Sequence, residues 1–162
     1  LLYDNSQDAS NAAIRTAIAF CEANGLSYVE KTGTTTAELM TASDALVAEG
    51  VDAVFTPSDN TVMTAELAIF EKFTEAKIPH YAGADSFALY DVNYVNLGTV
   101  TADMAVEVLV SGKSPATTPV QTLADGIITV NTQTAEACGI DVSIFEGLGS
   151  EVVEVVTALS FE

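Results

Sequence analysis

The sequence predicts a three-layer α/β/α lobe built on a parallel sheet, and two observations support this fold class. Short apolar, β-branched segments alternate with segments of helical apolar spacing from residue 1 to residue 82, a pattern typical of parallel strands joined by helical crossovers. The chain has 162 residues, of which 49% are apolar, so it can bury one substantial core and is too short for two full-sized domains.

Each expected helix in this part carries an apolar stripe and a recognisable end. Gly25 and Gly50 follow polar residues as helix C-terminal signals, and the threonines at positions 34–36 with Glu38 offer an N-terminal cap. The expected strands cover residues 1–3, 26–30, 51–56 and 78–82, and the expected helices cover residues 11–23, about 34–49 and 61–76.

The pattern changes after Asp85. Residues 94–98 lead into an expected helix at residues 99–110, and a linker then precedes an expected strand at 126–131 and a short helix at 132–138. The tail from residue 144 shows weak helical or strand character and is left unassigned.

The charge balance excludes several partners. Lys and Arg number 5 against 23 Asp and Glu, so the formal charge is −18 and polyanions such as nucleic acid or an anionic membrane would be repelled. Cys21 and Cys138 are far apart and lack metal-ligand spacing, which favours small buried thiols and leaves a single disulfide as the alternative. No apolar run reaches the length of a membrane span.

Polar side chains follow three of the expected strands at the point where each strand ends. In an open parallel α/β sheet, small ligands bind beyond the carboxyl ends of the strands, where helix N-termini present free amide groups. Each cluster could instead serve only to cap a helix, but three clusters on one edge favour a ligand site. The candidate residues are Asn5, Ser6, Thr56, Ser58, Asp59, Asn60, Asp85 and Ser86.

The sequence offers little catalytic chemistry. His80 lies inside an expected strand, where a core histidine is the better interpretation, and the chain has no phosphate-binding or dinucleotide-binding glycine loop. Asp4, Asp59 and Asp85 could form an acidic Mg²⁺ pocket as in a receiver domain, but no lysine ends a late strand as such a domain requires. We therefore expect a binding protein that is not an enzyme and needs no cofactor or metal.

The order of motifs resembles the ABC-transporter substrate-binding proteins of the tryptophan and tyrosine type, which have the type I periplasmic-binding fold. The block at residues 51–61 is the most specific part, and the resemblance runs from residue 1 to about residue 145. The motifs are LYDNS at 2–6, VDAVFTPSDNT at 51–61, AKIP at 76–79, YVNLG at 94–98, SGKSP at 111–115 and VNTQTA at 130–135 before GI at 139–140.

This resemblance implies that the chain is the carboxyl-terminal half of a two-lobe protein that captures a small solute, such as an amino acid, for a membrane permease. Residues 1–92 would be the ligand-binding lobe, residues 93–145 a crossover segment whose helix packs on the missing first lobe, and residues 146–162 a tail. The family implies an extracytoplasmic lipoprotein whose signal lies outside this chain. Without the first lobe, the apolar face of helix 99–110 would be exposed, covered by a second copy in a homodimer, or covered by a rearranged tail.

The same resemblance maps ligand contacts onto the polar clusters. Helix-start amides with Ser6 and Asn60 would suit a ligand carboxylate, and Asp59 or Asp85 would suit an amino group. Aromatic residues that could stack on an aromatic ligand are Tyr3, Phe87 and Tyr90. The alternative function is the effector-binding lobe of a LacI-type transcription regulator, which shares the fold.

Overall fold

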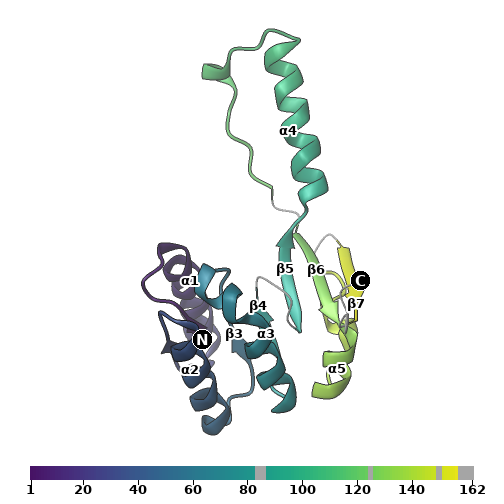
Figure 1. Ribbon diagram of the computed structural model, residues 1–162. Coiled ribbons are helices and arrows are strands. Elements are labelled where there is room, and N and C mark those ends of the chain that lie inside the picture. Colours follow the sequence, from purple (N-terminus) through teal and green to yellow (C-terminus); the bar gives the residue numbers. More distant parts are fainter. Residues whose placement is uncertain (83–86, 124–125, 149–150, 157–162) are drawn as a thin grey trace.

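The first part of the chain forms the alternating strands and helices that the sequence predicts (Figure 1). The computed structural model describes residues 1–82, 87–123, 126–148 and 151–156. Its first seven elements are β1 (Leu2–Tyr3), α1 (Asp8–Asn24), β2 (Lys31–Thr32), α2 (Thr36–Glu49), β3 (Val54–Phe55), α3 (Asn60–Glu75) and β4 (His80–Ala82). The later elements are β5 (Ala88–Val92), α4 (Tyr94–Leu109), β6 (Gly126–Asn131), α5 (Thr132–Cys138) and β7 (Glu151–Val155), with 3-10 helices η1 (Pro115–Thr117) and η2 (Val142–Phe145).

The strands make a parallel α/β arrangement with one exception. β1 pairs with β2 in parallel, and the larger sheet has the order β3-β4-β5-β6-β7. The β3–β4, β4–β5 and β6–β7 pairs are parallel, whereas β5 and β6 are antiparallel. The predicted α/β class with a parallel sheet is confirmed, and the antiparallel β5–β6 pair is an addition that the sequence did not predict. The chain leaves the sheet after β5 and returns to the same end to start β6, so its direction reverses.

Several boundaries differ from the sequence prediction. The strand expected at residues 26–30 is absent, and only Lys31 and Thr32 pair with the short β1. The helix expected at residue 99 begins five residues earlier, because the Asn93 side chain accepts a hydrogen bond from the Asn96 amide at 2.9 Å and caps it. β5 and β7 were not predicted.

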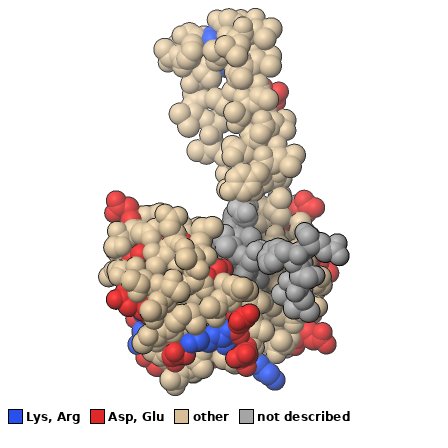
Figure 2. Space-filling view, viewed as in Figure 1, with Lys and Arg blue, Asp and Glu red and all other residues tan. Residues whose placement is uncertain are grey.

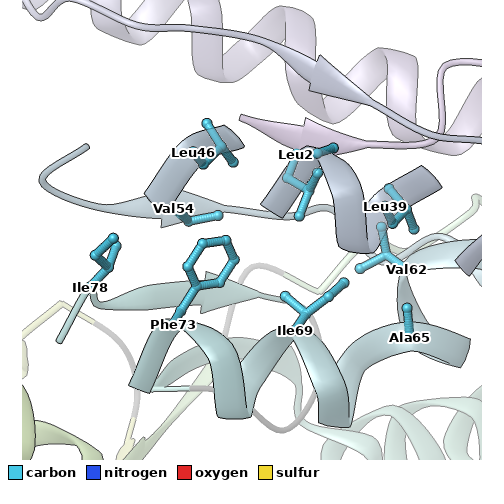
Figure 3. Packing of buried hydrophobic residues seen from close by; sticks show 10 residues of the cluster. Leu2, Leu39, Leu46, Val54, Val62, Ala65, Ile69, Phe73 and Ile78 are labelled. Carbon is cyan, nitrogen blue, oxygen red and sulfur yellow. The ribbon is translucent and has the colours of Figure 1, made fainter. Parts of the chain in front are cut away.

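One apolar core joins β1, α2, β3 and α3 (Figure 3). The α3 helix contributes Val62, Ala65, Ile69 and Phe73, whose spacing of three or four residues places them on one face. Leu2 lies among them at 0% exposure. Each fully buried Leu, Ile or Phe side chain contributes about 1.5–3 kcal/mol, so this core holds the polar turns of β1 and β3 at one place.

A second cluster covers the far part of the sheet. It packs Phe87, Val130 and Phe145 around Ala135 of α5, and the Phe87 and Phe145 rings meet edge to face with centroids 5.8 Å apart. This contact fixes η2 against the sheet.

The segment from residue 93 to residue 123, which we call the arm, projects away from the rest of the molecule (Figure 1). None of the α4 residues is buried, and Val95 and Leu109 are each 82% exposed. The arm contains only three charged residues, Asp103, Glu107 and Lys113, whereas acidic side chains are spread over the body (Figure 2). A long, almost uncharged apolar surface of this kind is typical of an interaction surface.

Candidate functional site

The turns after β1 and β3 are joined by a pair of buried carboxylates. The backbone N–H of Asp4 donates to Oδ2 of Asp59 at 3.1 Å, so the ends of the two strands lie side by side. Asp4 and Asp59 are each only 2% exposed. The two turns thus lie together as the sequence predicts, although β1 and β3 belong to different sheets.

Asp59 holds the start of α3. Its Oδ1 accepts a hydrogen bond from the Val62 N–H at 2.7 Å, which makes it the N-cap of the helix. Its Oδ2 accepts a second bond from the Ser10 hydroxyl at 2.7 Å, in addition to that from Asp4. The carboxylate thus links α1, β1 and α3 within the protein.

Asp4 organises the turn before α1. Its Oδ1 accepts from the N–H and the hydroxyl of Ser6 at 2.9 and 2.6 Å, and its Oδ2 accepts from the Thr61 hydroxyl at 2.6 Å and the Gln7 amide at 3.1 Å. The hydrogen bonds from Ser6, and then those from Thr61 and Gln7, hold the pKa of Asp4 far below its usual value, although burial opposes this effect. The turn therefore contains a stable negative charge.

Gln7 connects the two turns and leaves its own helix uncapped. Its side-chain nitrogen donates to Thr61 Oγ1 at 2.8 Å, and its side-chain oxygen accepts from the Asn60 N–H at 3.2 Å. Gln7 occupies the N-cap position of α1 but makes no side-chain cap bond, whereas Thr35, Asp59 and other side chains cap α2 to α5. The first-turn amides of α1 remain a place for an external acceptor.

An apolar cavity of about 490 Å³ adjoins this edge. Phe55 and Tyr81 line it, while Val54, the residue before Phe55, belongs to the core beneath α3. Because side chains alternate along a strand, the cavity lies on the face of the sheet opposite that core. The remaining lining residues are Ala13, Thr56, Pro57, Ser58, Ala82, Ala88, Ile128, Phe145 and Leu148.

The predicted site residues fall into three groups. Exposed side chains at the edge are Asn5, Ser6, Ser58 and Asn60, and Ser6 already donates to Asp4. Buried side chains are Thr56 and Asp59. Asp85 and Ser86 lie outside the described residues.

Sequence reasoning missed Gln7 and the apolar lining of the cavity. Phe55 and Tyr81 could have been found from strand alternation, because they are register partners on the face away from α3. Phe145 could not, since only the packing of η2 brings it to the sheet.

Two aromatic residues proposed for stacking have other partners within the protein. The Tyr3 hydroxyl donates to Glu30 at 2.7 Å, and Phe87 is fully buried in the second cluster. The side chain of Tyr90 is not among those described. Cys21 and Cys138 are half-buried free thiols, which answers the open question of a disulfide.

A buried polar chain runs under the loop that follows β3. The Thr56 hydroxyl lies 2.9 Å from His80 Nε2, and His80 Nδ1 lies 3.7 Å from Glu66 Oε1. His80 is 2% exposed, and burial lowers its pKa to about 4, so the imidazole is neutral near pH 7.

Within the described part of the chain, no three or more His, Cys, Asp or Glu side chains are grouped in a way that could hold a metal ion. Nor does any described helix combine the length and the apolar character needed to cross a bilayer.

Comparison with known proteins identifies the family. Residues 1–155 match the family model described as ABC transporter substrate binding protein. The chain therefore belongs to this family of ABC-transporter substrate-binding proteins, as its motifs predicted.

The relatives include a tyrosine-binding protein of Clostridioides difficile (strain R20291), 28% identical over 143 residues, which are 85% of this chain and 41% of the relative. A ligand-free, open structure of a substrate-binding protein with adhesive properties from Clostridium difficile matches with a TM-score of 0.78 and 29% identity, over 97% of this chain and 53% of that one. The ABC domain of Streptococcus pneumonia in complex with L-Trp matches with a TM-score of 0.72 and 27% identity, over 94% and 55%. The chain thus spans about half the length of these proteins.

Proposed function

We propose that this chain is the ligand-binding half of a substrate-binding protein that serves an ABC importer, and that it binds an amino acid with an apolar or aromatic side chain. The observation that carries the proposal is the apolar cavity beside an uncapped helix N-terminus and a polar rim. The relatives described as binding tyrosine or in complex with L-Trp support this ligand class.

An amino acid would present its polar end to the rim and its side chain to the cavity. The first-turn amides of α1, with the side chains of Asn5 and Asn60, suit the ligand carboxylate because the helix N-terminus carries partial positive charge. Asp85 and Ser86 remain candidates for contacts with the amino group. The cavity of about 490 Å³ lies in the range of small-ligand pockets, and Phe55 and Tyr81 offer ring contacts.

Catalysis is not part of the proposal. Asp4 and Asp59, two carboxylates at this edge, already accept several internal hydrogen bonds each, which suits a structural role better than proton transfer.

The full binding site would need a second wall. We expect residues 1–92 to form the ligand-binding lobe, with residues 93–145 as the crossover segment and residues 146–162 as the tail. In this reading the arm packs on the first lobe, and hinge closure between the lobes buries the ligand. The isolated chain would then bind weakly, because it supplies only half of the contacts.

The proposal places the longer protein outside the cytoplasm, anchored as a lipoprotein and delivering its ligand to a membrane permease. In the isolated chain, the apolar surface of the arm would pair with a second copy. Sedimentation velocity should then show a concentration-dependent dimer that Leu109→Glu dissociates, since Leu109 is 82% exposed. Only monomer at high concentration would contradict the dimer.

Ligand titration tests the binding function directly. L-tyrosine, L-tryptophan and glycine would be titrated into the ¹⁵N-labelled chain and followed by NMR, which detects weak binding. We expect the aromatic amino acids to shift the amide signals of residues 5–9 and 58–60, and glycine to have a much smaller effect. Ala13→Phe should block the cavity, whereas Ala12→Phe, one position along α1 and exposed, is the matched control. Equal binding by both variants would refute the assignment of the cavity.

A further inference from the structure

Glu66, His80 and Thr56 form a buried row of polar side chains that is separate from the polar rim of the proposed site. Thr56 is 0% exposed, His80 2% and Glu66 7%, so all three polar side chains are removed from water. Thr56 directly follows β3, His80 begins β4 and Glu66 lies in the middle of α3. The Phe73 ring packs on the imidazole with centroids 5.5 Å apart.

Polar side chains fill a core at a higher desolvation cost than apolar side chains do. Burying a histidine and a glutamate costs desolvation energy, and replacing buried polar contacts by apolar side chains of similar volume is often neutral or stabilising. A requirement for stability alone therefore does not account for these residues.

The position of Thr56 points to another role. Its N–H makes a strand bond to the Tyr81 carbonyl at 3.0 Å, and the next residues, Pro57 and Ser58, leave the sheet and line the cavity. This short loop is held at its far end by the Asp59 carboxylate. At its near end, the side-chain bond from Thr56 to His80 holds it against β4.

We propose that His80, supported by Glu66, is a positioning residue that fixes residues 57–60 of the binding loop through the Thr56 hydroxyl. The inference rests on the proposed function and extends it by naming residues that act on the ligand without touching it. Oε1 of Glu66 lies 3.7 Å from Nδ1, too far for a hydrogen bond, and a carboxylate oxygen on that side of the ring favours the neutral tautomer with its proton on Nδ1. Nε2 then accepts the Thr56 hydroxyl proton, which sets the direction of that hydrogen bond.

The test compares Thr56→Val, which keeps the β-branched shape and removes the hydroxyl, with Ser43→Ala. Ser43 is a control in α2 whose buried hydroxyl donates to the Leu39 carbonyl at 2.8 Å, away from the cavity. The wild-type chain and both variants would be studied by amide hydrogen exchange, urea unfolding and NMR titration with L-tyrosine. Thr56→Ser, which restores a hydroxyl, serves as the rescue variant.

We expect Thr56→Val to speed amide exchange at residues 58–60 and to weaken L-tyrosine binding by about tenfold, the effect of one lost hydrogen bond. His80→Leu should do the same and should also lower the urea midpoint, because the Thr56 hydroxyl is then buried without its partner. Thr56→Ser should restore the slow amide exchange of the loop. Ser43→Ala should change the midpoint without changing loop exchange or binding. The imidazole ¹⁵N shifts of the wild type should report a proton on Nδ1.

Unchanged loop exchange in Thr56→Val and His80→Leu would overturn the inference, as would losses of binding that only follow the loss of stability. If the wild-type chain binds neither L-tyrosine nor L-tryptophan, the proposed function fails. The exchange data then decide the positioning role by themselves, because they need no ligand.

Discussion

Replacing Asp59 by alanine should destabilise the protein far more than the loss of an ordinary helix cap. The carboxylate accepts three hydrogen bonds, from the amides of Val62 and Asp4 and from the Ser10 hydroxyl. The cap bond contributes about 1 kcal/mol, and the other two contribute about 1 kcal/mol each or more, because their buried donors lose a charged acceptor. We expect a total loss of about 3 kcal/mol in the free energy of unfolding for Asp59→Ala.

Urea unfolding followed by far-UV circular dichroism measures this loss, with Thr35→Ala as the matched control. Thr35 caps α2 through one bond from the Glu38 N–H at 3.2 Å and lies at the surface, so its loss should cost about 0.5–1 kcal/mol. A double-mutant cycle with Ser10→Ala should give a coupling of about 1 kcal/mol. If Asp59→Ala costs no more than Thr35→Ala but weakens ligand binding, Asp59 is a ligand contact and the structural reasoning is wrong.

Four further substitutions test local features by urea unfolding. Gly33→Ala should cost about 1–3 kcal/mol, because its Cβ would lie 2.6 Å from the Leu39 nitrogen; Gly98→Ala meets nothing within 4 Å and should stabilise α4 by up to about 1 kcal/mol. The backbone φ angle of Lys77 is 57°, in the left-handed region that glycine adopts without strain, so Lys77→Gly should raise the free energy of unfolding by about 0.5–1 kcal/mol. A decrease would show that Lys77 is not strained. Asp4 has a lowered pKa when folded, so its charge stabilises the fold above the unfolded pKa of about 3.9 and this contribution is lost as the pH falls further. The difference in unfolding free energy between the wild type and Asp4→Asn should therefore shrink between about pH 5 and about pH 2. A difference that does not change with pH would contradict the role of the hydrogen-bonded carboxylate.

The regular part of the fold could be predicted because its signals are local. The cap at Thr35 with Glu38 and the glycines at positions 25 and 50 mark helix ends through the hydrogen bonds and φ angles of neighbouring residues. β5 and β7 were missed because short strands form only where a partner strand is in register, and β7 depends on β6.

The location of the candidate site could be predicted from the sequence, but the hydrogen-bond partners of its residues could not. Asn5 and Asn60 could be assigned to one edge because parallel strands end together. Whether a polar side chain faces a ligand or another turn depends on pairs distant in the chain, such as Asp4 with Thr61, 57 positions apart. Sequence patterns could not show that Asp59 is enclosed by such bonds while Gln7 leaves α1 uncapped.

Composition and helix signals were thus enough to predict the α/β class, and the order of motifs around residues 51–61 was enough to suggest the family, because these depend on local chemistry and on the order of segments along the chain. Only the folded structure decided three features: the cavity, the antiparallel pairing of β6 with β5, and the buried row of Glu66, His80 and Thr56. They arise where separate elements pack together, and the free energy of that packing depends on distances and directions that no single segment contains.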